Sequence, residues 1–390
     1  MSPVDAHLDA RSAYVHIPFC SSVCPYCDFA VVAGADHMID RYADAVISEI
    51  GMSQPWGPLN SVYFGGGTPS HVPPSVLGRI LTTLQDHHGI GAGAEVSLEA
   101  NPEDFSEARA GELSQIGFNR VSFGAQSFDR AVLEALGRRH GPEQIMASVA
   151  AARGAAIGSI SVDLIFGTPL ETDQSWAHSL LSAIEASPDH VSCYALTVEP
   201  GTPLNRAVIA GAAAPDPDVQ ADRYEMAQAG LEAAGYHRYE VSNWCRPGHE
   251  CRYNLTVWAQ GQYEAYGNGA HRFRDGVRSR NVRRLDAYLS EVAAGRRPIA
   301  GAEPVTGWDT EIDRLFVGLR RSAGVSDGPG VQSLVGSAEG KLLQEAGVIE
   351  MSGGRLVVRR PLLTDEVHRA VLGLEAPIGW VEPPTPDNVW

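Results

Sequence analysis

The feature that most constrains the fold is an alternation of short β-rich runs with helical stretches, spaced at roughly 30 residues, the length of one βαβ unit. Helical stretches such as 40–52, 75–87 and 106–115 lie between these runs, and Ser106 is suited to cap the last of them. Parallel strands need crossover connections, which are right-handed. We therefore predict an α/β fold, a partial (β/α)6 barrel with helices on one side, because eight units would close a complete barrel. The predicted strands are Tyr14–Ile17, Val62–Phe64, Glu95–Glu99, Arg120–Phe123, Ser159–Ile165 and His190–Ala195.

A glycine-rich turn, Phe64–Ser70, follows the second predicted strand. In such barrels the chemistry lies at the C-terminal ends of the strands. Glycines let the backbone approach a ligand closely, and their amides can hold a carboxylate or a polar tail. The turn lacks the Gly-Lys-Ser/Thr ending of a Walker loop. A purely structural turn remains the alternative.

Polar side chains mark the next three predicted strands: Glu99 ends the third, Gln126 follows the fourth, and Asp163 lies in the fifth. A carboxylate in an apolar strand is costly unless it is paired or binds a ligand. Each could instead bond to a loop amide, but their repetition at equivalent ends favours a common pocket. Arg138 could pair with a carboxylate there, and we expect the adjacent His140 to be a capping or surface histidine.

Three cysteines, Cys20, Cys24 and Cys27, form a C-x3-C-x2-C triplet after the first strand, in a chain with six cysteines. They are best explained as ligands. An iron–sulfur cube held by three cysteines leaves one iron open to an external ligand. A zinc site ordinarily has a fourth protein ligand. A disulfide would leave one thiol unpaired, and nothing in the sequence suggests secretion.

The composition of the chain argues against nucleic acid and a membrane span. The net charge of −17 argues against a broad nucleic-acid surface, and no basic run stands out beyond residues 272–284. The start of the chain lacks an apolar export segment, and no apolar run reaches the length of a membrane span. We expect a cytoplasmic protein with no transmembrane segment, which leaves peripheral membrane contact open. The scattered Cys193, Cys245 and Cys251 suit a reducing cytosol.

We predict five regions: an N-terminal tail (1–12), a core barrel (13–240), a Gly/aromatic segment (241–280), a smaller, mostly helical C-terminal domain (281–375) and a Pro-rich tail (376–390). Within the core, the Pro-, Gly- and Ala-rich residues 199–219 read as a linker or long loop. A short β pair is expected near residues 348–358.

Taken together and in order, these motifs resemble the HemN/HemW group of radical S-adenosylmethionine (SAM) proteins. The resemblance runs from about Tyr14 to beyond His271. It is carried by the cysteine loop and by Gly65–Ser70, Glu99–Glu103, Gly124–Phe128, Leu136–Pro142 and Asp163–Pro169.

The resemblance implies a radical SAM core barrel over 13–240 and a HemN-type domain over 281–375. It implies a [4Fe–4S] cluster on Cys20, Cys24 and Cys27, with SAM on the open iron. It identifies no catalytic residue. By position, the residues implied to line the SAM pocket are Tyr14, Tyr26, Gly66, Gly67, Thr68, Glu99, Gln126, Arg138, Asp163 and Ala195.

Within the group, oxygen-independent coproporphyrinogen III oxidases carry a further cysteine two residues past the third cluster ligand, where this chain has Phe29. The Cys27–Phe29 ending and the segment Tyr239–Trp244 are instead similar to the HemW-type haem chaperones. The resemblance therefore implies haem binding and delivery of haem to an acceptor haemoprotein, without coproporphyrinogen III oxidase activity.

The haem-linked motif of that group, His-Asn-x-x-Tyr-Trp, is altered here. Tyr253 replaces its histidine and Val257 its tyrosine, while Asn254 and Trp258 remain. Tyrosinate can ligate haem iron, with Arg252 as a basic neighbour. The ligand stays open, and Cys251, His249 and His271 are the nearby alternatives.

The alternative function is a HemN-like enzyme, either coproporphyrinogen oxidase-like or a methyltransferase. It would use a cellular electron donor and cleave SAM to a 5′-deoxyadenosyl radical, sheltered from water by the barrel. Radical modification of tRNA fits poorly with the acidic composition.

Overall fold

The computed structural model of the chain describes residues 10–380. Residues 1–9 and 381–390, which belong to the two predicted tails, lie outside the described part.

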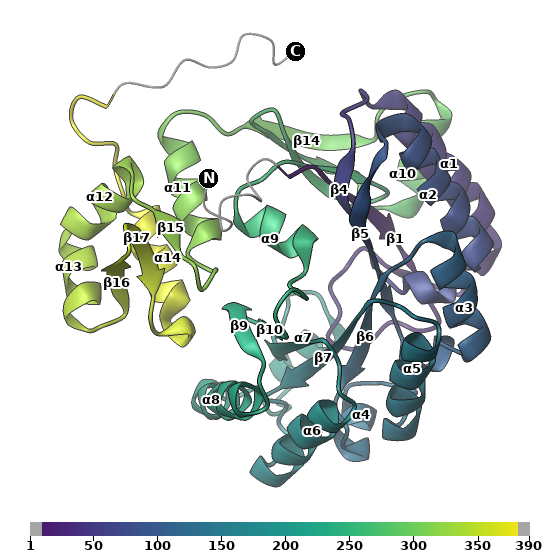
Figure 1. Cartoon of the computed structure of the whole chain (residues 1–390), viewed down its shortest axis with the longest axis horizontal. Helices are drawn as coiled ribbons and strands as arrows, with labels where there is room; N and C mark the ends of the chain where they lie inside the picture. The colour runs from purple at the N-terminus through teal and green to yellow at the C-terminus, as the bar shows by residue number, and fades with distance from the viewer. Residues whose placement is uncertain (1–9, 381–390) are drawn as a thin grey trace.

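One twelve-stranded sheet forms the body of the molecule, in the order β14-β13-β12-β11-β1-β4-β5-β6-β7-β8-β10-β9 (Figure 1). Its centre is a run of six parallel strands, each containing one of the predicted runs, so the α/β partial barrel is confirmed. These strands are β1 (Ser12–Ile17), β4 (Leu59–Gly66), β5 (Ile90–Ala100), β6 (Arg120–Gln126), β7 (Ser159–Phe166) and β8 (His190–Ala195).

Helices cover the outer face of the parallel strands (Figure 1). In α1 the buried residues Ile39, Tyr42, Val46 and Ile50 recur at helical spacing, so one side packs on the sheet. None of the helices within residues 10–380 is long and apolar enough to cross a membrane. The covering helices are α1 (Ile39–Met52), α2 (Pro74–His88), α3 (Glu107–Ile116), α4 (Arg130–Ala135), α5 (Pro142–Gly154), α6 (Asp173–Glu185) and α8 (Pro217–Ala233).

The predicted linker 199–219 is wrong in part, because it contains α7 (Pro203–Ile209) and the start of α8. Both helices begin with proline in the first turn, where the missing N–H costs no hydrogen bond. Thr202 and Asp216 cap them by accepting from backbone N–H groups. Prolines that indicate a loop in the sequence therefore start helices here.

The sheet extends beyond the barrel at both edges. At one edge, β10 (Asn243–Cys245) pairs with β8, and β9 (His237–Glu240) pairs with β10. At the other, β11 (Tyr263–Tyr266) pairs in parallel with β1 and leads into an antiparallel run of three strands. That run is β12 (His271–Arg274), β13 (Val277–Asn281) and β14 (Ile299–Pro304), with α10 (Leu285–Ala293) between the last two.

The region 281–375 was predicted to be mostly helical, and its first part, residues 281–304, includes β14, an edge strand. Most of its side chains are exposed, so it lacks the alternation of apolar and polar residues that marks a half-buried strand. The predicted domain ranges stay predictions. The boundary after residue 280 falls inside β13, so the strands on both sides of it share one sheet.

Residues 308–372 form a C-terminal lobe with its own core, which includes Leu315, Leu334, Leu356 and Val367. Its three-stranded sheet has the order β15-β17-β16, and the predicted β pair is β16 with β17. The elements are α11 (Trp308–Gly318), β15 (Val325–Ser326), α12 (Pro329–Gly336), α13 (Ala338–Glu345), β16 (Ile349–Ser352), β17 (Arg355–Val358) and α14 (Thr364–Leu372).

A short helix, α9 (Arg252–Trp258), lies between the large sheet and the C-terminal lobe (Figure 1). It contacts β1 and β4 on one side and α11 on the other. The guanidinium of Arg320 lies over the Trp258 ring, 4.7 Å from its centroid. The candidate haem segment is therefore held between two separately packed units.

The buried carboxylate of Glu49 joins α1 to the added strands. It accepts hydrogen bonds from the Gly267 amide (2.8 Å), the Tyr288 hydroxyl (2.8 Å) and the Asn281 side-chain amide (2.6 Å). Burial raises its pKa to about 7 despite these bonds. The Glu49 carboxylate therefore accepts hydrogen bonds from three buried donors, which would lose this acceptor if Glu49 were removed.

Replacing Glu49 with Ala should lower the free energy of unfolding by at least about 3 kcal/mol, because each orphaned buried donor costs about 1–3 kcal/mol. Urea denaturation followed by circular dichroism measures the loss. The control is Asp44→Ala on the same helix, whose exposed ion pair with Arg79 contributes at most about 1 kcal/mol. Equal losses in the two variants would contradict this account.

Candidate cofactor site

A cavity of about 390 Å³ lies at the carboxyl ends of the parallel strands. It brings together the three cysteines of the triplet and every residue predicted for the SAM pocket except Tyr14. Those residues are Tyr26, Gly66, Gly67, Thr68, Glu99, Gln126, Arg138, Asp163 and Ala195. Tyr14 instead lines a neighbouring cavity.

The cysteine triplet occupies a loop that closes between two short parallel strands, β2 (Phe19–Cys20) and β3 (Val32–Ala33). The Thr68 hydroxyl lies 3.5 Å from the Cys20 Sγ, and the Arg138 Nη1 lies 3.4 Å from the Cys24 Sγ. Burial raises the pKa of Cys20 to about 11 and also raises that of Cys27. A metal centre must therefore displace the thiol protons when it binds.

The donor set of the triplet suits an iron–sulfur cluster. The three thiols line one cavity, and Arg138 lies beside them. Cysteine thiolates are the usual ligands of such clusters, and three of them leave one iron open. Within residues 10–380, the buried Nε of Arg138 has no hydrogen-bond acceptor, so one donor is left beside the cavity for a polar group.

The glycine turn at the end of β4 packs against the segment that carries the cysteines. Gly66 has φ of 111°, and a Cβ there would lie 2.3 Å from the His16 ring. A Cβ on Gly67 would lie 2.8 Å from the carbonyl oxygens of Ile17 and Phe19. The glycines are therefore required first by the protein's own packing, and their closeness fixes the cysteine loop beside the cavity.

Glu99 and the glycine turn are directly bonded. The Glu99 carboxylate accepts from the Gly66 amide and from the Tyr63 hydroxyl, both at 3.0 Å. Burial raises the pKa of Glu99 to about 7, with a further contribution from the charge of Asp163. Neutral pH therefore lies close to the titration of this carboxyl group.

Asp163 is surrounded by hydroxyl groups that the sequence analysis missed. It accepts hydrogen bonds from Ser122 (2.9 Å), Ser161 (3.1 Å) and Ser192 (2.7 Å), which come from β6, β7 and β8. Burial raises its pKa in spite of these bonds. Serines at inward positions of neighbouring strands could have predicted these hydrogen bonds, but only if the register of the strands had been known.

Gln126 ends β6 in a left-handed conformation, with φ of 65°, which is uncommon for a residue other than glycine. Next to it, the Arg138 Nη2 donates to the Asn101 Oδ1 (2.5 Å) and to the Gly124 carbonyl (3.0 Å). Asn101 is a further lining residue that the sequence analysis did not select.

His140 was predicted to be a capping or surface histidine; the surface alternative is wrong, because its ring is buried. Its two nitrogens lie 3.0 Å from the Glu103 carboxylate and 3.0 Å from the Ala125 carbonyl. The ring therefore supports the backbone that ends in Gln126.

A second cavity, of about 730 Å³, adjoins the first, and Phe29, Gly66, Glu99 and Asn254 line both. The candidate haem residues Tyr253, Trp258 and His271 line this second cavity. The ring of Tyr253 stacks on those of Tyr14 and Tyr63, at centroid distances of 5.8 and 5.3 Å.

The other candidate haem ligands are placed differently. Cys251 is buried at the first cavity, and burial raises its pKa to about 12. The Nδ1 of His249 lies 3.2 Å from the Ser159 hydroxyl, at the opposite end of β7. The Arg252 guanidinium donates to the Gly93 carbonyl, at 2.7 Å.

The fold and the cysteine loop define a radical SAM protein, and residues 14–183 match the family model of the Radical SAM superfamily. "Heme chaperone HemW" of Mycobacterium tuberculosis is 38% identical over 374 residues, covering 92% of this chain and 94% of the relative. The Bacillus subtilis protein of the same name is 33% identical, covering 93% and 99%. The chain therefore belongs to the HemW family.

Among solved structures, coproporphyrinogen III oxidase (HemN) from Escherichia coli, described as a radical SAM enzyme, aligns with a TM-score of 0.82. The alignment covers 94% of this chain and 92% of HemN, at 23% identity. At that identity the likeness demonstrates the shared fold. Membership of the superfamily implies a [4Fe–4S] cluster and SAM.

Replacing Cys24 with Ala should abolish the broad brown absorption of the reconstituted protein and lower its bound iron and sulfide, because one of three cluster ligands is lost. Anaerobic reconstitution followed by absorption spectra and iron and sulfide assays measures this. Cys193→Ser, which alters a buried cysteine in β8 outside the triplet, should leave the spectrum unchanged. An unaltered cluster in Cys24→Ala would overturn the ligand assignment.

Proposed function

We propose that this protein is a haem carrier. It holds haem in the second cavity, beside a [4Fe–4S] cluster and SAM in the first, and passes the haem to acceptor haemoproteins. The observation that carries the proposal is the lining of the second cavity, which combines aromatic walls, arginines and two histidines. The relatives' name, heme chaperone, supports the same function.

The chemistry of haem suits this lining. Its macrocycle is apolar and its two propionates are anionic. Tyr14, Tyr253 and Trp258 offer aromatic surface, while Arg280 and Arg283 offer guanidinium groups for carboxylates. The volume of about 730 Å³ lies within the range of about 300–1,000 Å³ that ligand sites occupy.

We propose His271 as the iron ligand in place of the histidine that the family motif has at position 253. Burial and the charges of Arg280 and Arg278 lower the pKa of His271, so its imidazole is neutral at pH 7 and can ligate a metal. Burial raises the pKa of Tyr253 well above its usual value, with further contributions from Tyr263 and Tyr14, which disfavours a phenolate ligand.

The other histidine of this cavity, His16, is less suited to bind iron. Its Nε2 lies 3.0 Å from the Ala30 carbonyl and its Nδ1 lies 3.2 Å from the Tyr14 hydroxyl, so both nitrogens have partners. His271 is therefore the better-placed imidazole.

Replacing His271 with Ala should weaken haem binding at least about tenfold and change the spectrum of the bound haem, because the axial nitrogen is lost. Tyr253→Phe keeps the aromatic wall and should change the affinity less than about threefold. Haem titration of the anaerobically reconstituted protein, followed by absorption spectra, measures both. The reverse order of effects would make Tyr253 the ligand. Failure of the unaltered protein to bind one haem would overturn the carrier function.

For the first cavity, we propose that Cys20, Cys24 and Cys27 hold the cluster and that the other lining residues named above hold SAM. When bound and reduced, the cluster would supply an electron to SAM. The residues of this chain would orient the cofactor: the Glu99 carboxylate would pair with the ammonium group of SAM, and the buried walls would exclude water.

The affinity for SAM should fall as the pH drops from 8 to 6. Glu99 has a pKa of about 7 in the folded protein, and a cationic ammonium group binds the ionised form. Below pH 7 binding must first release the carboxyl proton, so the affinity falls by up to about tenfold per pH unit. Equilibrium dialysis at several pH values measures this dependence.

Glu99→Gln should bind SAM more weakly at pH 8 and show a flat pH profile. Glu103→Gln is the matched control, since the Glu103 carboxyl bonds to His140 and its pKa is lowered, so it stays ionised throughout this range. A profile in Glu99→Gln as steep as that of the unaltered protein would exclude Glu99 as the titrating group.

The second candidate function is a radical SAM enzyme, favoured by a single cavity that holds the cysteine triplet and every predicted SAM residue except Tyr14. Release of 5′-deoxyadenosine and methionine on reduction, together with no specific haem binding, would support it. Coproporphyrinogen III oxidation is not proposed, since the exposed Phe29 stands where those oxidases carry a further cysteine.

A further inference from the structure

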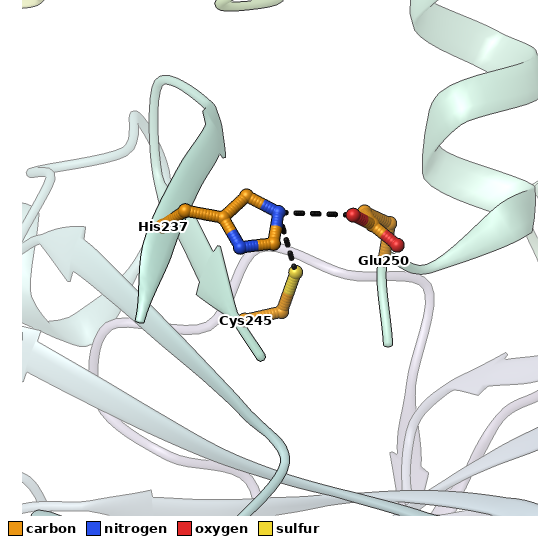
Figure 2. A group of neighbouring side chains, drawn as sticks. All are labelled: His237, Cys245 and Glu250. Atoms are coloured by element: carbon orange, nitrogen blue, oxygen red, sulfur yellow. Dashed lines mark hydrogen bonds and ion pairs between the residues drawn. The ribbon is translucent and has the colours of Figure 1, made fainter. Parts of the chain in front are cut away.

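Three side chains outside both cavities bring different metal-binding atoms together: His237 on β9, Cys245 at the end of β10, and Glu250 just before α9 (Figure 2). Their ligand atoms all lie within 4.8 Å of one another. Cys245 pairs with His190, the first residue of β8, so the group lies at the opposite end of the parallel strands from the cysteine triplet.

The sulfur and the carboxylate converge on the same ring nitrogen. The Nε2 of His237 lies 2.9 Å from the Glu250 Oε1 and 3.6 Å from the Cys245 Sγ (Figure 2). In the metal-free protein the Nε2–H can donate to Glu250 while the thiol contact at 3.6 Å stays weak, whereas one metal ion placed between the three atoms binds all of them.

This convergence argues against a nucleophilic relay. In a Cys–His–Glu relay the carboxylate bonds to the ring nitrogen that does not face the thiol, and so orients the imidazole. Here both partners contact Nε2.

The distances suit a tetrahedral ion. Zinc bonds of about 2.3 Å to sulfur and about 2.0 Å to nitrogen place those two ligand atoms about 3.5 Å apart, and two bonds of about 2.0 Å place nitrogen and oxygen about 3.3 Å apart. The observed separations are 3.6 and 2.9 Å. Adjusting the nitrogen–oxygen pair needs a shift of a few tenths of an ångström by side chains that are partly exposed.

We propose that His237, Cys245 and Glu250 bind one Zn²⁺ ion, with water in the fourth position. A neutral imidazole, a thiolate and a carboxylate give two negative charges, which neutralise the ion. Binding forms three ligand bonds and releases the Cys245 thiol proton to solvent, with no change of oxidation state.

The position of the three ligands at the edge of the sheet indicates a structural role for the ion. His237 and Cys245 lie on neighbouring strands at the sheet edge, and Glu250 stands two residues before Arg252, where α9 begins. On β9, the backbone of Tyr239 accepts from the Ser322 amide of the C-terminal lobe. The ion therefore ties the sheet edge to the segment 246–251 and fixes the start of the helix that carries Tyr253, Asn254 and Trp258.

The first test is metal content. The full-length protein, reconstituted with its cluster and then given Zn²⁺, should retain one zinc per chain after gel filtration. Cys245→Ser should retain less than a tenth of that amount, and His237→Gln and Glu250→Gln should bind at least about tenfold more weakly. Cys193→Ser is the control for loss of a buried thiol and should retain the full equivalent.

The second test uses Co²⁺ as a spectroscopic probe in a background in which Cys20, Cys24 and Cys27 are all replaced by Ala, which removes the competing thiols. One equivalent should give a thiolate-to-cobalt charge-transfer band that Cys245→Ser abolishes and Zn²⁺ displaces. Circular dichroism checks the fold. Should Cys245→Ser not fold, His237→Gln, in which a partly exposed side chain is changed, carries the test.

Zn²⁺ should also slow amide hydrogen exchange over residues 246–258. Cobalt binding that persists in both the Cys245 and His237 variants, or no stoichiometric zinc in the unaltered protein, would overturn the site. Zinc binding without slower exchange in 246–258 would overturn its role in fixing α9.

Discussion

The contact between the glycine turn of β4 and the β1–β2 connection is the constraint on which both cavities depend. A side chain at Gly66 or Gly67 would collide with the His16 ring or with the backbone at Ile17 and Phe19. Only this closeness lets the Gly66 amide reach Glu99 while Thr68 reaches Cys20. The cysteine loop, the buried carboxylate and the wall between the cavities are therefore set by one packing contact.

The hydrogen bonds and charges around Glu99, Asp163 and Arg138 then decide which of these buried groups can bind a ligand. Glu99 accepts two hydrogen bonds inside an apolar barrel and keeps a pKa of about 7, whereas Asp163, with three serine donors, is almost fully satisfied by the protein. Arg138 contacts Cys24, Asn101 and Gly124 and still has an unused buried Nε in the described part of the chain. Glu99 and Arg138, which can each form further hydrogen bonds or ion pairs, line the cavity, as expected of a binding site for a polar ligand.

The parallel strands could be predicted because short β-rich runs alternate with helical stretches, and three of these runs carry or precede a polar residue toward the carboxyl end. Because the carboxyl ends of parallel strands meet at one end of a barrel, the sequence also predicted that the triplet, Glu99, Gln126 and Asp163 lie in one region. What the sequence could not give was register. The serines around Asp163 look ordinary until neighbouring strands are aligned, and Tyr14 points to a second cavity that no local pattern defines. The prolines of 199–219 led to the incorrect prediction of a loop, because they lie in the first turns of α7 and α8. The strand β14 has too few apolar residues to be distinguished from a loop or helix by its sequence.

The wall shared by the two cavities has a thermodynamic consequence. Phe29, Gly66, Glu99 and Asn254 face both spaces, so whatever fills one space meets side chains that the other also uses. Asn254 lies on α9, which contacts β1, β4 and α11, so a shift of this helix alters the two spaces together. Occupancy of one space therefore changes the affinity of the other by a factor that must be the same in both directions. The free energy that links them is a single quantity, and it can be measured from either side.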